Sequence, residues 1–207
     1  MGERPGRRLR ARARRVADNC LDRLTGMTSR HPDGADDAHP YDVRYEASRW
    51  ASLTRVVPWS TVGHGDVFVD FGCGRGRALY VASWYRFGEV IGVEKSAELA
   101  EAARRDLSRA RGPARLRRAR VVTARVEDFD VPDSLTVGFL FNPFHGPVLD
   151  DLCARLADSV RRHPRRLRIV YANPVEGDRL VAHGFELTRS ARKLALYECR
   201  PEASRSQ

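Results

Sequence analysis

An acid and three glycines stand at regular spacing in the stretch Asp70-Phe71-Gly72-Cys73-Gly74-Arg75-Gly76. Glycine is needed where the backbone takes a positive φ or must touch a ligand. The Asp70 carboxylate can face a cationic group of such a ligand. Glu94, 18 residues after Gly76, is placed to accept hydrogen bonds from both hydroxyls of a ribose. Together these residues predict a site for an adenosine-containing ligand, at a spacing unlike the G-x-G-x-x-G of dinucleotide-binding loops.

A strand must precede the glycines and a helix must follow them for this site to form. Val67 to Phe71 is apolar and rich in β-branched and aromatic residues, as expected of a buried strand. The expected strands are Asp66 to Phe71, Glu89 to Glu94, Ala119 to Ala124, Thr136 to Phe141 and Leu167 to Tyr171, followed by a closing hairpin of Phe185 to Thr188 and Leu194 to Cys199. The expected helices are Arg49 to Val57, Arg77 to Tyr85, Ala97 to Arg109, Val148 to Arg161 and Glu176 to His183.

This alternation predicts an α/β fold, a Rossmann-like, doubly wound and mostly parallel seven-stranded sheet with an antiparallel closing hairpin and an N-terminal helical lid. The length of 207 residues favours one domain. We expect a basic arm and linker over 1–40, partly disordered, a catalytic domain over 41–199 with 41–60 as its lid, and a disordered tail over 200–207. The segment 41–60 is equally compatible with simple packing against the sheet.

The turn after the fourth strand reads Asn142-Pro143-Phe144. The Asn142 side-chain carbonyl can accept hydrogen bonds from an amino group, and the Phe144 ring can stack on a planar acceptor. The alternative is a structural proline turn with Phe144 in the core. His145 is a candidate for assisting proton removal, or a solvated side chain. Asp128 or Glu127 is the candidate contact for an adenine amino group.

These motifs resemble those of class I S-adenosylmethionine-dependent methyltransferases. The D-x-G-x-G-x-G pattern from Asp70 is similar to their first motif. The turn at Asn142 is similar to the (D/N)-P-P-(F/Y) motif of amino-methyltransferases, although one residue is missing. Arg125 stands where many of these enzymes have an acid for adenine. A small uncharacterised actinobacterial-type group has a similar layout, including a segment like Tyr41 to Glu46. The resemblance covers roughly residues 41–199.

The resemblance implies S-adenosyl-L-methionine as cofactor, no metal, and methyl transfer to a nitrogen of a protein side chain or small molecule. The implied cofactor contacts are Asp70, Gly72, Cys73, Gly74, Gly76, Glu94, Lys95, Asp128 and Asn142; the implied catalytic residues are Asn142, Pro143 and Phe144. An RNA methyltransferase and a non-catalytic cofactor-binding module are the alternatives. An NAD(P)-dependent oxidoreductase is disfavoured by the glycine spacing and by the acid that precedes it.

The positive charge of the chain is carried almost entirely by arginine. The formal net charge is +10, and only Lys95 and Lys193 are lysines. Clusters at 7–15, 115–120 and 161–168 can contact a polyanion such as RNA, or they can reflect the arginine usage of a GC-rich genome. Four scattered cysteines, no zinc-ligand spacing and no secretory or membrane-spanning apolar run predict a cytoplasmic protein.

Overall fold

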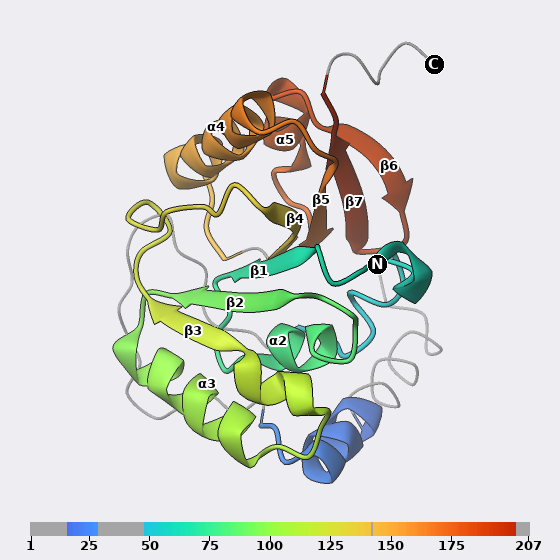
Figure 1. The fold of residues 1–207 in the computed structure, drawn as a ribbon, viewed down its shortest axis with the longest axis vertical. Coiled ribbons are helices and arrows are strands. Elements are labelled where there is room, and N and C mark those ends of the chain that lie inside the picture. The colour runs from blue at the N-terminus through green and yellow to red at the C-terminus, as the bar shows by residue number, and fades with distance from the viewer. Residues whose placement is uncertain (1–15, 29–47, 142, 202–207) are drawn as a thin grey trace, which may run out of the picture.

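A computed structural model describes residues 16–28, 48–141 and 143–201 of the chain (Figure 1). Several sequence expectations lie outside these residues. They are the arginine-rich arm over 7–15, the segment Tyr41 to Glu46, Asn142, and the tail from residue 202. In the described part, no helix is long and apolar enough to cross a membrane.

Within the described residues seven strands form one sheet in the order β3-β2-β1-β4-β5-β7-β6. The strands are β1 (Val67–Phe71), β2 (Glu89–Glu94), β3 (Arg120–Thr123), β4 (Leu135–Leu140), β5 (Leu167–Ala172), β6 (Glu186–Ser190) and β7 (Leu194–Cys199). The first five strands pair in parallel, and β7 pairs antiparallel with both β5 and β6. The chain order turns back at β1, so the loops after β1 and β4 lie side by side. Ligands of doubly wound sheets bind at such a point.

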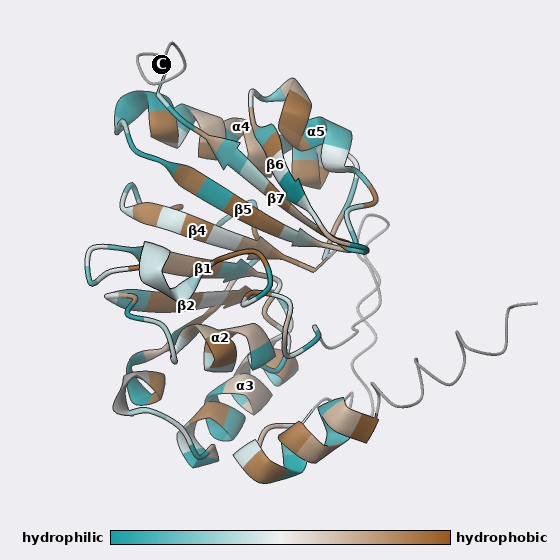
Figure 2. Cartoon of the chain, turned by 90° about the vertical axis from the view of Figure 1, so that its right-hand side faces the viewer, coloured by the Kyte–Doolittle hydropathy of each residue, from teal (hydrophilic) through white to brown (hydrophobic). Residues whose placement is uncertain are grey.

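Helices cover both faces of the sheet (Figure 2). On one face lie α2 (Arg77–Ala82) and α3 (Ala97–Arg109), and on the other lie α4 (Pro147–Arg162) and α5 (Gly177–Ala182). The described part of the chain also contains two 3-10 turns, η1 (Trp59–Thr61) and η2 (Ala114–Arg118). Each face of the sheet therefore has its own hydrophobic core, and β1 and β5 are buried along their whole length.

The seven-stranded sheet expected from the sequence is observed, and most element bounds agree within one or two residues. The helix expected over Arg77 to Tyr85 ends at Ala82, because the N–H groups of Trp84 and Tyr85 bond three residues back and tighten its last turn.

The expected helix over Arg49 to Val57 was wrong, since this segment forms irregular turns. The N–H of Ser52 bonds three residues back to Arg49, whereas that of Val57 bonds four back to Leu53. Leu53 and Val57 are fully buried in the core on the α2 side, so tertiary packing determines the backbone of this short segment.

Residues 16–25 are helical, and this helix lies beside the end of α3 (Figures 1 and 2). The N–H of Arg111 donates to the carbonyl of Thr25 at 2.8 Å. The apolar side chains of Val16, Cys20, Leu21 and Leu24 in this helix are exposed. The buried residues of the segment are Asp22 and Met27. A charged side chain thus occupies the face that this helix presents to the domain.

Candidate active site

The turn that joins β1 to α2 is built on glycines in the left-handed region. Gly72, Gly74 and Gly76 have φ values of 83°, 52° and 80°, which side chains other than glycine rarely adopt. The N–H groups of Gly72 and Cys73 both donate to the carbonyl of Val93 at 2.9 Å. These bonds fix the turn to the end of β2.

Gly72 also lies against the loop that follows β4. A Cβ atom placed on Gly72 would be 2.5 Å from the Cβ of Pro143, closer than real Cβ contacts allow. The position therefore needs glycine for space as well as for its φ. The same contact places Pro143 of the post-β4 loop next to the glycine turn.

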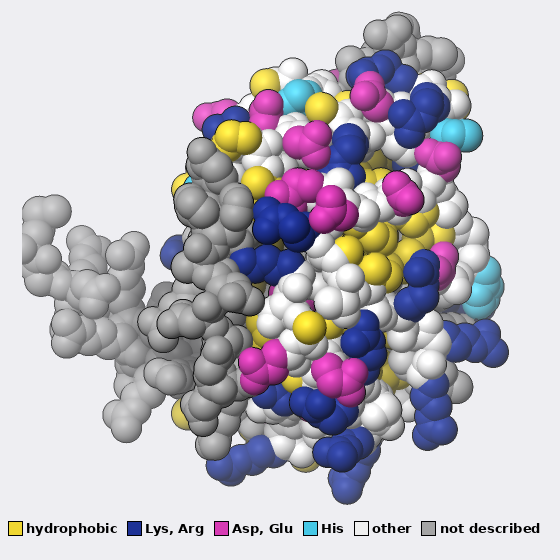
Figure 3. Space-filling model, turned by 90° about the vertical axis from the view of Figure 1, so that its left-hand side faces the viewer, with side chains coloured by type: hydrophobic (Ala, Val, Ile, Leu, Met, Phe, Trp, Pro, Cys, Tyr) yellow, Lys and Arg dark blue, Asp and Glu magenta, His cyan; other side chains and the backbone are white. Residues whose placement is uncertain are grey.

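Two acids lie at the carboxyl ends of neighbouring parallel strands. Asp70 in β1 is 3% exposed, and Glu94 at the end of β2 is 7% exposed. Glu94 accepts hydrogen bonds from the N–H of Gly74 at 2.8 Å and from the N–H of Ser96 at 3.0 Å. The Asp70 carboxylate makes no hydrogen bond with any residue in the described part of the chain. Figure 3 looks onto the side toward which β1, β2 and β3 point in Figure 1, where acidic and basic side chains are intermingled.

Burial perturbs both acids in the same direction. Desolvation raises the pKa of Asp70 well above its usual range, and the nearby Glu94 charge raises it further. Burial also raises the pKa of Glu94, although hydrogen bonds from Ser96 and Gly74 oppose this shift. A ligand with a cationic group near Asp70 and hydroxyl donors near Glu94 would stabilise the ionised forms of both acids.

Cys73, in the middle of the glycine turn, is 6% exposed. Burial, with smaller contributions from the charges of Asp70 and Glu94, raises the pKa of its thiol well above the usual value. A Cβ placed on Gly92 of β2 would be 2.7 Å from its Sγ atom. The thiol is therefore a neutral group packed under the turn.

The other predicted cofactor contacts lie nearer the surface. Lys95 is half-buried directly after Glu94, and Asp128 is exposed in the loop after β3. The N–H of Asp128 donates to the carbonyl of Arg125 at 3.2 Å. Arg125 in turn pairs with Glu127 at 2.8 Å. The Arg125 charge is thus paired with a neighbouring acid of the same loop.

Arg155, which no sequence motif singled out, holds the loop after β3 in place. Arg155 of α4 donates from Nη2 to the carbonyl of Val126 at 2.8 Å and from Nη1 to that of Phe129 at 3.0 Å. This contact spans 26 to 29 residues, so local sequence patterns do not reveal it. It positions the stretch that contains Glu127 and Asp128.

In the loop after β4, Phe144 is buried and Pro143 is half-buried, while Asn142 lies outside the described residues. The Phe144 side chain is 5% exposed and belongs to the core beneath α4. This location favours the interpretation of Phe144 as a core residue over its role in stacking on an acceptor. Pro143 is the member of this motif that contacts the glycine turn.

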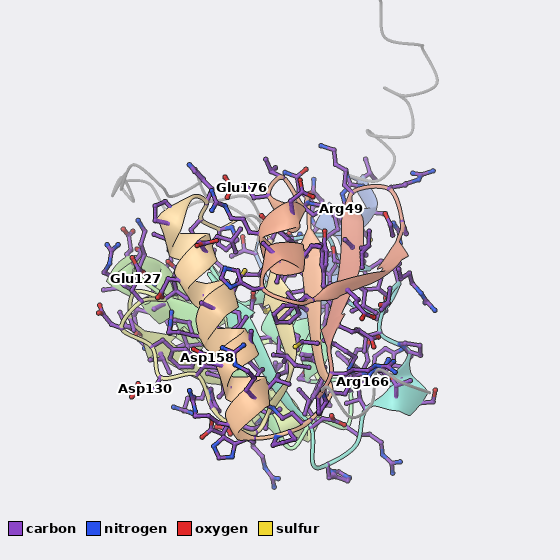
Figure 4. All side chains as sticks on the ribbon, turned by 90° about the horizontal axis from the view of Figure 1, so that it is seen from above. Arg49, Glu127, Asp130, Asp158, Arg166 and Glu176 are labelled. Carbon is purple, nitrogen blue, oxygen red and sulfur yellow. The ribbon has the colours of Figure 1, made fainter. Side chains whose placement is uncertain are left out.

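A second residue missed by the sequence analysis, Glu176, joins the loops after β4 and β5. Its Oε2 atom accepts from the N–H of Gly146 at 2.9 Å and from Nε of Arg179 at 2.6 Å. Arg179 also contacts Asp150 at 3.3 Å. Figure 4 shows Glu176 near the starts of α4 and α5, at the end of β5 opposite to Arg166. This network fixes the loop that borders the expected acceptor position.

Comparison with known proteins agrees with this geometry. Residues 68–165, which contain the glycine turn and both buried acids, match the family model described as a methyltransferase domain. This part of the chain is a methyltransferase domain. No curated protein matches the sequence.

Solved structures of methyltransferases resemble this enzyme in fold. A putative methyltransferase from Pseudomonas syringae has a TM-score of 0.50 at 15% identity, covering 73% of this chain and 96% of that one. An RNA methyltransferase from Salinibacter ruber in complex with S-adenosyl-L-homocysteine has a TM-score of 0.47 at 17% identity, covering 72% and 90%. A ribosomal protein L11 methylase from Lactobacillus delbrueckii subsp. bulgaricus has a TM-score of 0.49 at 20% identity, covering 73% and 77%.

Proposed function

We propose that this methyltransferase transfers the methyl group of S-adenosylmethionine to a nitrogen atom of a protein side chain or small molecule. The cofactor assignment rests on the buried Asp70 carboxylate, which lies beside Glu94. Asp70 has no hydrogen-bond partner among the described residues, so its carboxylate is available to a ligand. In this proposal Asp70 pairs with the cationic methionine portion, Glu94 accepts from the ribose hydroxyls, and Gly72, Gly74 and Gly76 admit the ligand to the backbone. Cys73, Lys95 and Asp128 complete the cofactor contacts.

Bound S-adenosylmethionine supplies a methyl group that its sulfonium already activates. The protein then has to hold the acceptor in line with that methyl group, and positioning of this kind contributes several kcal/mol, up to about 7–11. The contact between Pro143 and Gly72 supports an acceptor position beside the post-β4 loop. The nitrogen assignment rests on the sequence of this loop, in which Asn142 would accept a hydrogen bond from the acceptor's amino group.

The short connections on this edge of the sheet support a small acceptor or an exposed side chain of a protein. In the described residues, the segments between each strand and the next helix are 72–76, 95–96 and 173–176 after β1, β2 and β5. None of them holds an inserted substrate domain. All four cysteines are free thiols, which supports, within the same proposal, a reducing compartment such as the cytoplasm.

Two measurements test this function. Calorimetric titration of S-adenosylmethionine should show binding to the wild type and greatly weakened binding to Glu94→Ala. No binding to the wild type would disprove the cofactor assignment. Incubation with methyl-labelled cofactor and a fractionated extract should label a protein or a small molecule. A nitrogen acceptor predicts label that resists mild base, whereas label released by mild base would indicate a methyl ester instead.

RNA is the second candidate acceptor, and one surface favours it. Along α3 and η2 the exposed arginines Arg109, Arg111, Arg117 and Arg118 have no ion-pair partner among the described residues. Lys and Arg side chains gather over the lower part of Figure 3, where α3 lies. RNA binding to this surface should weaken steeply as salt rises, and labelled RNA from the extract would place RNA ahead of the other acceptors.

The cluster over residues 161–168 does not form a comparable surface. Arg166 pairs with the buried Glu198 at 2.6 Å, and Arg168 is 5% exposed beside Asp66. Arg165 donates to the carbonyls of Leu135, Ser159 and His163. These three arginines hold the amino-end edge of the sheet together. Arg161 and Arg162 are exposed, but they pair with Asp158 and Asp133, so most of the charge of this cluster is already paired.

A further inference from the structure

A buried ion pair connects the N-terminal helix to the glycine turn. Nη2 of Arg77 donates to both carboxylate oxygens of Asp22, at 2.6 and 2.7 Å. Arg77 is the first residue of α2, directly after Gly76 of the turn. Arg77 and Asp22 are only 6% and 8% exposed, although they are 55 residues apart in the sequence. Helix 16–25 is thus fastened to the residue next to the proposed cofactor site.

Trp50 and Ser48 bring a third segment to the same guanidinium. The indole N–H of Trp50 donates to Oδ1 of Asp22 at 3.1 Å, and the Arg77 guanidinium lies over the Trp50 ring, 5.2 Å from its centroid. Nη1 of Arg77 donates to the carbonyl of Ser48 at 2.7 Å. The start of α2, the helix over 16–25 and the segment 48–50 therefore meet at one charged group.

Fold stability alone does not explain a buried ion pair between Asp22 and Arg77. Desolvation of two charges offsets most of their attraction, and apolar residues of similar volume often stabilise a protein equally well. Nε of Arg77 is also buried with no hydrogen-bond partner among the described residues. The N–H donors of a planar guanidinium point in fixed directions, so their hydrogen bonds define the position of the backbone that carries the arginine.

The other arginine of the turn is anchored in a similar way. Nε of Arg75 donates to Oδ2 of Asp106 in α3 at 2.8 Å. Gly76 lies between the two arginines and has a φ of 80°, so glycine itself contributes little restraint there. Hydrogen bonds to Val93 and Glu94 hold the first half of the turn. Its second half is held by two ion pairs, one to α3 and one to helix 16–25.

We propose that Asp22 and Arg77 are positioning residues for the cofactor site. Asp22 docks helix 16–25 on Arg77 and thereby holds the turn over 72–76 in its binding conformation. Cofactor binding and docking of this helix are consequently coupled, and each stabilises the other by the same free energy. The inference rests on the proposed assignment of the glycine turn to S-adenosylmethionine.

The test measures the affinity for S-adenosylhomocysteine by calorimetry in the wild type, Asp22→Asn and Arg77→Lys. We expect affinity to fall about tenfold in Asp22→Asn, a typical coupling magnitude, and less in Arg77→Lys, which keeps the charge. Once a methyl acceptor is identified, steady-state kinetics should show that Asp22→Asn raises the KM for the cofactor and leaves kcat at saturation nearly unchanged. Glu198→Gln is the matched control, since Glu198 is a buried acid paired with Arg166 and Arg200 far from the turn. It should lower the melting temperature and leave the affinity unchanged.

Hydrogen exchange provides the reciprocal readout. S-Adenosylhomocysteine should slow amide exchange over residues 16–28 in the wild type, and this protection should be lost in Asp22→Asn while β4 and β5 stay protected. If Asp22→Asn does not fold, Trp50→Phe is the milder variant, since it removes the hydrogen bond to Asp22 and leaves a smaller aromatic ring beside Arg77. It should weaken binding about two- to fivefold. Wild-type affinity in the variants, or unchanged exchange over 16–28 on binding, would overturn the coupling. Failure of the wild type to bind would instead contradict the cofactor assignment itself.

Discussion

Glu94 accepts a hydrogen bond from the backbone N–H of Gly74 at 2.8 Å, across the gap between the end of β2 and the glycine turn. The bond orients a carboxylate that is 7% exposed and the middle of the turn at the same time. Loss of this carboxylate should therefore affect both the ligand contact and the turn.

Glu94→Gln should weaken cofactor binding without unfolding the protein. The amide keeps the size of the side chain, but it replaces one of the two acceptor oxygens by an NH₂ group, which cannot accept a hydrogen bond. Glutamine can therefore accept from only one of the two N–H groups, Gly74 and Ser96, and it has fewer acceptor sites for the ribose hydroxyls. Loss of hydrogen bonds to a charged group costs about 1.5–3 kcal/mol, which corresponds to roughly a 10- to 150-fold increase in Kd. Calorimetry checks the prediction, with Glu101→Gln on the exposed face of α3 as the control. Equal affinity of Glu94→Gln and the wild type would contradict it.

Asp70 should make the ligand-free protein less stable as pH rises. Its folded-state pKa lies well above the unfolded value because of burial and the Glu94 charge. The folded state therefore binds more protons in the interval between these two pKa values, and stability falls as pH increases through the folded value. Thermal unfolding from pH 4 to pH 8 should show this decline.

Asp70→Asn should remove most of that pH dependence and raise the melting temperature at pH 7. The same substitution should weaken cofactor binding, because the neutral amide no longer pairs with a cationic ligand group. A variant that is both less stable and less able to bind would indicate that Asp70 is a structural acid. Asp130→Asn, at an exposed position of the loop after β3, is the control for the loss of one carboxylate.

Gly72→Ala should destabilise the protein by about 2–5 kcal/mol. A positive φ costs an alanine about 1–2 kcal/mol, and the clash with Pro143 adds an overpacking penalty of about 1–3 kcal/mol. This corresponds to a decrease in melting temperature of roughly 4–20 °C for a chain of this size. Gly65→Ala is the matched control, since nothing lies within 4 Å of its Cβ position and its φ is not positive. Similar melting temperatures for the two variants would refute the steric argument.

Phe144 substitutions separate a core role from an acceptor-stacking role. Because the ring is 5% exposed in the core under α4, Phe144→Ala should lower the free energy of unfolding by about 3–5 kcal/mol. Phe144→Leu should cost less than about 1.5 kcal/mol and leave the acceptor KM near the wild-type value. A stable Phe144→Leu protein with a strongly raised acceptor KM would restore the stacking interpretation.

The sequence predicted the fold well because its signals are local. The apolar run before Gly72 and the acid at the end of β2 each depend on a few neighbouring residues, and the bounds of β2 and α3 agree with the expected ones. The contacts that position the site are mostly long-range. The Asp22–Arg77 pair and the Glu176–Gly146 bond join residues 55 and 30 positions apart, and no local periodicity encodes such partners.

Burial explains most of the remaining differences. Phe144 follows a turn motif whose composition suits either a stacking role or a core role, and only the packing of α4 decides between them. The segment over 49–57 has helical spacing, yet Leu53 and Val57 adopt the backbone that their core positions require. Arginine clusters look alike in the sequence, whereas their pairing with acids such as Glu198 separates structural residues from a free surface.

The position of Trp50 gives the enzyme a built-in optical probe. Its indole N–H bonds to Asp22 and its ring lies against the Arg77 guanidinium, so the polarity around it changes if these groups move apart. The other tryptophans, Trp59 and Trp84, are 48% and 51% exposed. Phenylalanine at both positions would keep an aromatic ring against their neighbours Tyr85 and Tyr80. In such a single-tryptophan protein, the emission wavelength would follow ligand binding in real time, without a label.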